Sequence, residues 1–225
     1  MEEPKRDRRS PIERVYDRVA SVYDWYEGPM DWLGGRPRRE RIISGARGRV
    51  LEIGVGTGRN LEFYPPAAEL TAIDISDRML ERAGRRAASL GRGVDLRHAD
   101  AEALPFPEAS FDTVTATCVF CSVADPIRGL EEARRVLKPG GEARLIEHVR
   151  PRNPVLGKLF DWVSPLTRRL LGSEMNRRTE SNVRAAGFEI TDVRRDGIWR
   201  EIIARPAPLP LEGAGADAEH GRRQS

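Results

Sequence analysis

The chain has 225 residues, of which 39% are hydrophobic and 32% charged, and its formal net charge is +3 at pH 7. This is the composition of a globular domain, and no stretch reaches the roughly 20 apolar residues of a membrane-spanning helix. Acidic residues alternate with the arginines, which argues against a dedicated nucleic-acid-binding protein. We therefore expect one cytoplasmic domain that has no secretion leader and no nucleic-acid partner.

The two ends of the chain differ from the middle. Residues 1–11 are charged and bounded by proline, while residues 206–225 are rich in Pro, Gly, Ala and charged residues and have no periodic apolar pattern. Both compositions are typical of disorder. We expect disordered tails at 1–11 and 206–225 and a single domain at 12–205.

Between the tails, short apolar runs alternate with amphipathic helical patterns. The expected strands are residues 50–53, 70–74, 94–98, 111–117 and 143–148. This alternation predicts parallel βαβ units and therefore a doubly wound α/β sheet. Residues 188–195 and 199–206, joined by a turn at Asp196-Gly197, predict a final antiparallel hairpin.

The helices between the strands have readable ends. Ser76 is typical of a helix N-cap and Gly91 of a stop. Asp125, followed by Pro126, caps a second helix, which ends at 138–141, and a third helix around 177–186 ends at Gly187. The expected inward residues are Met79, Leu80, Ala83, Ala87 and Leu90 in the first helix and Ile127, Leu130 and Leu137 in the second.

A glycine-rich loop, LEIGVGTGRN at 51–60, follows the first strand and leads toward an expected helix. Gly54, Gly56 and Gly58 let the backbone turn sharply and approach a ligand closely. The spacing is GxGxG, whereas dinucleotide sites carry GxGxxG, and Glu52 precedes the loop. Because a carboxylate repels a pyrophosphate but suits an ammonium group, the loop favours S-adenosylmethionine.

Two further acids follow neighbouring strands. Asp74 ends the second strand, where a carboxylate can accept hydrogen bonds from ribose hydroxyls, and Asp100 follows the third, where it can accept from an adenine amine. Singly, each is also compatible with a turn or capping residue. Ligands of such sheets bind at the carboxyl edge, so acids at three strand ends together favour a nucleoside ligand.

The loop, the Asp74 strand end, HADAEALPFPEASFDTV at 98–114 and RVLKPGG at 135–141 together resemble class I S-adenosylmethionine-dependent methyltransferases. The resemblance covers roughly residues 15–204. It implies a seven-stranded Rossmann-like sheet in the order 3-2-1-4-5-7-6. It also implies that Gly54, Gly56, Gly58 and Asn60 hold the methionine part of the donor, Asp74 the ribose, and Asp100 with Ala101 the adenine.

Three other segments are similar to thiol, phospholipid N- and quinone methyltransferases: YDRVASVYDWY at 16–26, CVFCSVADP at 118–126 and EHVRPRNP at 147–154. This resemblance implies that Tyr23 closes over the donor. The expected donor-binding set also contains Glu52, Ile75, Met79 and Cys118. The C-terminal segment of the quinone enzymes is not recognisable here, which weakens that assignment.

The acceptor decides what chemistry the protein must add. Alignment suffices for an amine or a thiolate, whereas a carbon or hydroxyl acceptor needs a base. His148, near the end of the fifth strand, is the candidate, and a purely structural histidine is the alternative. Cys118 and Cys121 have the spacing of a redox or zinc pair, but we favour a pocket-lining Cys118 and a Cys121 that packs as a small hydrophobe. We expect no metal.

Our leading hypothesis is methylation of an amine or thiol on a small or lipid-like acceptor. The alternatives are quinone C-methylation, nicotinamide-dependent oxidation, and a basic module that binds RNA or membrane. Residues 150–180 mix apolar and basic side chains, and we expect them to form a lid over the acceptor with possible peripheral membrane contact. The oligomeric state is left open.

Overall fold

The structure is a computed structural model that describes residues 14, 16, 17, 35–148, 158 and 178–208. Tyr23, the tail at 1–11, residues 209–225 and nearly all of the expected lid at 150–180 lie outside the described residues. Of the expected C-terminal tail, only residues 206–208 are described, and the last strand ends at Pro206.

One seven-stranded sheet in the order β3-β2-β1-β4-β5-β7-β6 organises the domain. The strands are β1 (Arg49–Ile53), β2 (Glu69–Asp74), β3 (Asp95–His98), β4 (Phe111–Thr117), β5 (Leu137–His148), β6 (Phe188–Asp196) and β7 (Trp199–Pro206). The first five run parallel, and β7 is antiparallel to both of its neighbours. The strand order and the final hairpin are therefore confirmed.

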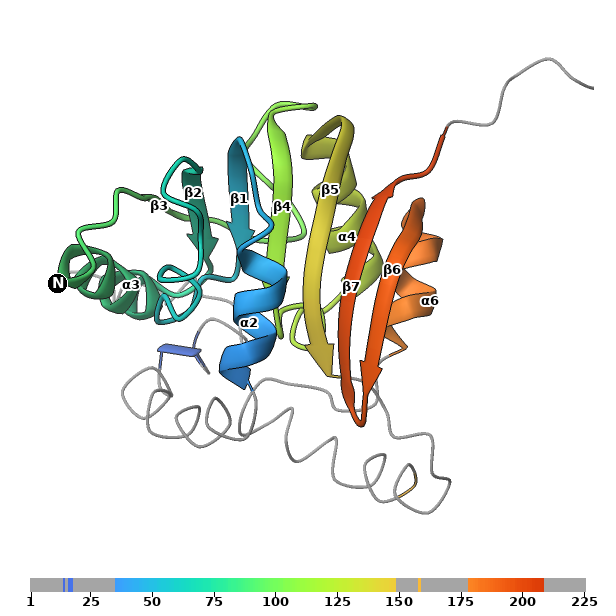
Figure 1. Ribbon diagram of the computed structural model, residues 1–225, viewed down its shortest axis with the longest axis horizontal. Helices are drawn as coiled ribbons and strands as arrows, with labels where there is room; N and C mark the ends of the chain where they lie inside the picture. The colour runs from blue at the N-terminus through green and yellow to red at the C-terminus, as the bar shows by residue number, and fades with distance from the viewer. Residues whose placement is uncertain (1–13, 15, 18–34, 149–157, 159–177, 209–225) are drawn as a thin grey trace, which may run out of the picture.

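Helices cover both faces of this sheet (Figure 1). They are α2 (Arg36–Ile43), α3 (Asp77–Ser89), α4 (Pro126–Val136) and α6 (Thr179–Ala185). Ile43 of α2 and Ala83 of α3 belong to one hydrophobic cluster, and Leu130 of α4 and Val183 of α6 belong to another. Strand residues alternate between the two clusters, since Val50 joins the first and Leu51 the second. Among the described residues, no helix is long and apolar enough to cross a bilayer.

The predicted helix caps are confirmed. The Ser76 hydroxyl accepts a hydrogen bond from the Met79 N–H at 3.2 Å, and Asp125 Oδ1 accepts from the N–H groups of Ile127 and Arg128 at 3.0 and 3.1 Å. The prediction of inward-facing residues is wrong at two positions, because Leu90 is 46% exposed and Ile127 is 36% exposed.

Helical position explains both errors. Leu90 follows the last residue of α3, just before Gly91 turns the chain with φ +61°. The buried residues of α4 are Pro126, Gly129, Leu130, Ala133 and Val136. Their spacing of three and four residues defines a stripe that Ile127 lies beside.

The prediction of a helix directly after the glycine loop is also wrong. Residues 56–63 form successive turns instead, with hydrogen bonds from the N–H of Gly58 to the carbonyl of Val55 and from Leu61 to Gly58. Pro65 and Pro66 follow at once and lack the N–H groups that a continuing helix needs. Another difference is that β5 begins at Leu137 and not at 143, with an irregularity where it pairs with Phe111–Thr113.

Candidate active site

The glycine loop joins β1 to the rest of the carboxyl edge. Gly54, Gly56 and Gly58 all have positive φ, at +67°, +54° and +82°. A Cβ on Gly54 would lie 2.5 Å from Val119 Cγ2, and one on Gly58 would lie 3.1 Å from Ala83 Cα, whereas one on Gly56 would meet nothing within 4 Å. Gly54 and Gly58 therefore permit close packing, and Gly56 leaves backbone open beside the site.

Asp74, at the end of β2, links this loop to the start of α3. One carboxylate oxygen accepts from the Gly56 N–H at 2.8 Å, and the other accepts from the Ser76 N–H at 3.0 Å. Burial raises the pKa of Asp74 to about 6, although these backbone donors oppose the shift. The backbone of the glycine loop and of Ser76 thus holds the buried Asp74 carboxylate in place at the carboxyl edge of the sheet.

Glu52, on β1, is a second buried acid, only 1% exposed. Asn60 Nδ2 donates to Glu52 Oε1 at 2.7 Å and to Thr117 Oγ1 at 3.1 Å. On the other side of the same amide, Arg39 Nη1 of α2 donates to Asn60 Oδ1 at 2.8 Å. Burial raises the pKa of Glu52 to about 7. Sequence reasoning missed Arg39, one of 38 Lys and Arg residues.

Glu147, on β5, supports the loop after β4 from the opposite face. Its Oε1 accepts from the N–H groups of Val119 and Phe120, both at 2.9 Å, and burial raises its pKa to about 7. The same loop holds Cys118 at φ +56°, a conformation that few non-glycine residues adopt. Cys121 is buried and donates from Sγ to the Cys118 carbonyl at 3.3 Å.

His148 is the last residue of β5 and faces the side of α2. Its Nδ1 lies 3.6 Å from Cys118 Sγ, and its ring packs against Trp199 of β7 with the ring centroids 3.8 Å apart. Burial, together with the charges of Arg38 and Arg39, lowers the pKa of His148 to about 4. Its Nε2 is buried and has no hydrogen-bond partner among the described residues. The imidazole is therefore neutral at physiological pH.

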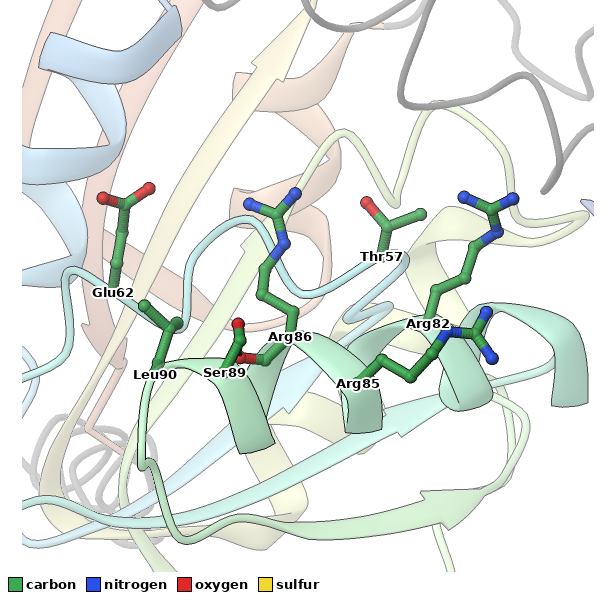
Figure 2. A pocket seen from close by; sticks show the side chains of 7 residues that line it. All are labelled: Thr57, Glu62, Arg82, Arg85, Arg86, Ser89 and Leu90. Atoms are coloured by element: carbon green, nitrogen blue, oxygen red, sulfur yellow. Dashed lines mark hydrogen bonds between the residues drawn. The ribbon is translucent and has the colours of Figure 1, made fainter.

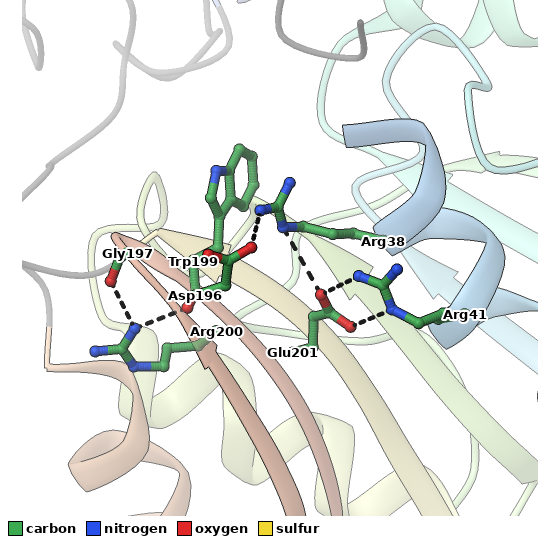
Figure 3. A network of polar contacts seen from close by, with 7 residues as sticks. All are labelled: Arg38, Arg41, Asp196, Gly197, Trp199, Arg200 and Glu201. Carbon is green, nitrogen blue, oxygen red and sulfur yellow. Dashed lines mark hydrogen bonds and ion pairs between the residues drawn. The ribbon is translucent and has the colours of Figure 1, made fainter. Parts of the chain in front are cut away.

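A polar network holds Trp199 in this position (Figure 3). Arg41 donates to both carboxylate oxygens of Glu201, from Nε at 3.1 Å and from Nη2 at 2.6 Å. Arg38 pairs with Glu201 and Asp196, and its guanidinium carbon lies 5.1 Å from the centre of the Trp199 ring. Arginines of α2 thereby fasten the tip of the β6–β7 hairpin beside His148.

The first Tyr-Asp pair of the chain also reaches the edge. The Tyr16 hydroxyl donates to Ser122 Oγ at 2.7 Å, and Ser76 Oγ donates to Asp17 Oδ1 at 2.6 Å. The two contacts connect the segment after β4 with the start of α3. Sequence reasoning singled out only Tyr23 of the second Tyr-Asp pair, although the repeat of the dipeptide is a signal that could have found the first.

The other predicted residues lie along the neighbouring strand ends. Asp100 is exposed and its Oδ1 accepts from the Glu102 N–H at 2.9 Å, while Ala101 is buried. The Ile75 carbonyl lies 2.8 Å from His98 Nε2, and Met79 is buried in the first turn of α3. The structure thus connects Glu52 with Asn60 and Asp74 with Gly56 by hydrogen bonds and places Asp100 just after β3.

A separate cavity of about 580 Å³ lies between the glycine loop and α3 (Figure 2). It is lined by Thr57, Glu62, Arg82, Arg85, Arg86, Ser89 and Leu90. Arg82 and Arg86 extend toward the same side as Thr57. None of the predicted donor-binding residues lines this cavity, so it is distinct from the carboxyl edge of the sheet where Glu52 and Asp74 lie.

Comparisons with known proteins show the family of the chain. The family described as "Methyltransferase domain" matches residues 51–145. A phosphatidylethanolamine N-methyltransferase of Cereibacter sphaeroides is 37% identical over 147 residues, which cover 64% of this chain and 71% of that protein. A demethylmenaquinone methyltransferase of Roseiflexus castenholzii is 32% identical over 224 residues, covering 93% and 91%. The solved YcgJ protein of Bacillus subtilis is 28% identical with a TM-score of 0.61 and covers 71% of each chain.

The fold and the glycine loop define a Rossmann-like domain, a class of sheet whose ligands bind at the carboxyl edge of the strands. The chain belongs to the S-adenosylmethionine-dependent methyltransferases. Its methyl donor is S-adenosylmethionine, so the nicotinamide alternative is not supported. The described residues fit this donor, because buried acids suit a ligand with ammonium and sulfonium charges and Gly56 offers backbone that no side chain covers.

Proposed function

We propose that this enzyme methylates an amine or thiol of a small or lipid-like acceptor at the carboxyl edge of the sheet. The observation that carries the proposal is the neutral imidazole of His148 at this edge, whose buried Nε2 has no partner among the described residues. A neutral imidazole is a proton acceptor. Alignment suffices for a free amine or a thiolate, whereas an acceptor that enters as an ammonium or a neutral thiol must lose a proton, and His148 can accept it.

The donor-binding assignments are part of this proposal. Glu52, Gly54, Gly56, Gly58 and Asn60 surround the methionine part, and Asp74, Ile75 and Met79 surround the ribose. Asp100 and Ala101 face the adenine, and Cys118 closes the pocket with its backbone. The supporting contacts are the hydrogen bonds that tie Gly56 to Asp74 and Asn60 to Glu52. For Tyr23, which lies outside the described residues, donor contact stays a prediction.

The protein itself takes little part in the covalent chemistry of this reaction. S-adenosylmethionine supplies an activated methyl group, so the side chains mainly align the acceptor and exclude water. The acceptor nitrogen or sulfur would form its bond to the methyl carbon as the sulfonium–methyl bond breaks and S-adenosylhomocysteine leaves, and the proton that the acceptor gives up would pass to His148 Nε2. The relative from Cereibacter sphaeroides, whose name specifies a phospholipid amine, supports an amine acceptor.

Quinone C-methylation is the second candidate. The relative from Roseiflexus castenholzii is named for a demethylmenaquinone acceptor and aligns with 93% of this chain. A carbon acceptor of this kind needs a base to remove a hydroxyl proton. His148 suits that role as well as it suits an amine or thiol. In both cases, residues 150–180 serve as the acceptor lid, with peripheral membrane contact as part of the proposal.

The test is methyl transfer from labelled S-adenosylmethionine to phosphatidylethanolamine, small thiols and demethylated quinones, with donor affinity measured in parallel. We expect a labelled amine or thiol, and a His148→Gln variant that binds the donor normally but transfers methyl more slowly. Labelled quinone alone selects the second candidate. Unchanged transfer by His148→Gln removes the base from the proposal.

A further inference from the structure

The side chains of Cys118 and His148 meet where β4 and β5 end. Cys118 Sγ lies 3.6 Å from His148 Nδ1, a hydrogen-bonding distance for sulfur. Trp199 packs against the ring, with the ring centroids 3.8 Å apart. The other ring nitrogen, Nε2, is buried and has no hydrogen-bond partner among the residues that the structure describes. The protein therefore contacts the imidazole at Nδ1 and leaves Nε2 for the reaction.

The backbone around Cys118 is bound to β5 on both sides of the cysteine. The Cys118 N–H donates to the Ile146 carbonyl at 2.8 Å, and the next two N–H groups donate to the Glu147 carboxylate. Cys118 itself has φ +56°, a conformation that is costly for a non-glycine residue and that clusters at functional sites. The contacts with β5 maintain this conformation, so the sulfur is fixed beside His148.

The hydrogen bond at Nδ1 decides which nitrogen of a neutral imidazole carries the proton. If the thiol donates to Nδ1, the proton lies on Nε2, where a buried N–H would have no acceptor in the described part of the chain. Buried N–H groups without an acceptor are rare because they are costly. If Nδ1–H donates to the sulfur instead, Nε2 keeps only a lone pair. The geometry therefore favours the proton on Nδ1.

We propose that Cys118 is a positioning residue whose sulfur accepts a hydrogen bond from His148 Nδ1–H and thereby keeps Nε2 unprotonated and ready to take a proton from the methyl acceptor. This inference rests on the proposed function, which assigns the base to Nε2. A thiol can accept one hydrogen bond while it donates another, so other contacts of the sulfur are compatible with this role. The competing explanation is that Cys118 only fills space beside the ring.

Nitrogen NMR of the donor-free, ¹⁵N-labelled protein separates these explanations, because protonated and unprotonated ring nitrogens have different chemical shifts. The chain has three histidines, so a His148→Gln variant assigns the signals of His148. Cys118→Ala removes the acceptor, and Cys118→Ser keeps one. The matched control is Cys121→Ser, because Cys121 donates to the Cys118 carbonyl at 3.3 Å and a serine keeps that donor.

We expect the wild type to carry the proton on Nδ1. Cys118→Ala should shift the tautomer ratio toward Nε2–H by about two- to fivefold, the size of one modest hydrogen bond. With the acceptor that the transfer assay labels, kcat should fall by a similar factor, while the dissociation constant for S-adenosylmethionine changes less than about twofold. Cys118→Ser should restore both the tautomer and kcat, and Cys121→Ser should match the wild type. Circular dichroism melting confirms that each variant is folded.

Two results overturn the inference: a wild type whose Nε2 carries the proton, or a Cys118→Ala variant whose tautomer ratio is unchanged. Both are read from the ring nitrogens without any acceptor, so they do not depend on the activity assay. The proposed base is tested separately by His148→Gln, because unchanged transfer in that variant removes it whichever tautomer the wild type adopts.

Discussion

The buried carboxyl of Glu52 makes the stability of the donor-free enzyme depend on pH. Its pKa rises from the ordinary 4.5 to about 7 in the folded state, with burial as the leading cause. Between these two values, the folded protein keeps a proton that the unfolded chain has lost. Stability therefore falls as pH rises through this window, by about 1.4 kcal/mol per pH unit for this one group. The full penalty, about 3 kcal/mol, is present above the folded pKa and absent below the unfolded one.

Glu52→Gln removes the titrating group and keeps an oxygen that can accept from Asn60 Nδ2. We expect the variant to be more stable than the wild type by up to about 3 kcal/mol at about pH 8, and close to it at about pH 4.5. Urea unfolding without donor at both pH values measures the difference. Glu69→Gln, at the exposed start of β2, is the control and should show no such pH dependence. An equal stability difference at the two pH values would refute the reasoning.

Three further predictions address the site. Gly56→Arg should abolish donor binding in calorimetry while leaving a folded protein, because Gly56 has φ +54° and open space where a side chain would project; retained affinity would contradict the assigned loop. Trp199→Ala should expose the imidazole of His148 and move its pKa up from about 4 toward 6.5, as followed by NMR titration of the ring protons. Donor binding near neutral pH should release protons, since a cationic ligand lowers the pKa of Glu52 and Asp74. Calorimetry in buffers of different ionisation enthalpy detects the release, and net proton uptake would contradict it.

Local patterns were enough to predict most of the fold. The caps at Ser76 and Asp125 and the apolar runs of β1, β2 and β4 depend on neighbouring residues, and they appear as predicted. The missing helix after β1 shows the limit of such patterns. A glycine loop ordinarily opens a helix, but Asn60 is bound to Glu52 and prolines follow within a few residues.

The residues that complete the site depend on contacts between distant elements. The neutral state of His148 follows from burial beside Trp199, which belongs to the last strand. Arg39 reaches Asn60 from the helix before β1, and no spacing in the sequence distinguishes it from the neighbouring Arg38 and Arg41. The acidic strand ends were predictable because the carboxyl edge of a parallel sheet gathers them. Arg39, the basic residue that contacts Asn60, lies in α2 before the first strand, where the βαβ pattern predicts no site residue.

The fastening of the β6–β7 hairpin to α2 has a consequence for synthesis of the chain. Arg38 and Arg41 emerge from the ribosome before the first strand, whereas Glu201 and Trp199 arrive with the last one. Until β7 pairs with β5, the edge of β5 is open and the imidazole of His148 lies in water with its ordinary basicity. Docking of the final strand therefore closes the sheet and buries the imidazole of His148 in a single event, so a partly made chain has neither the finished sheet nor the buried histidine.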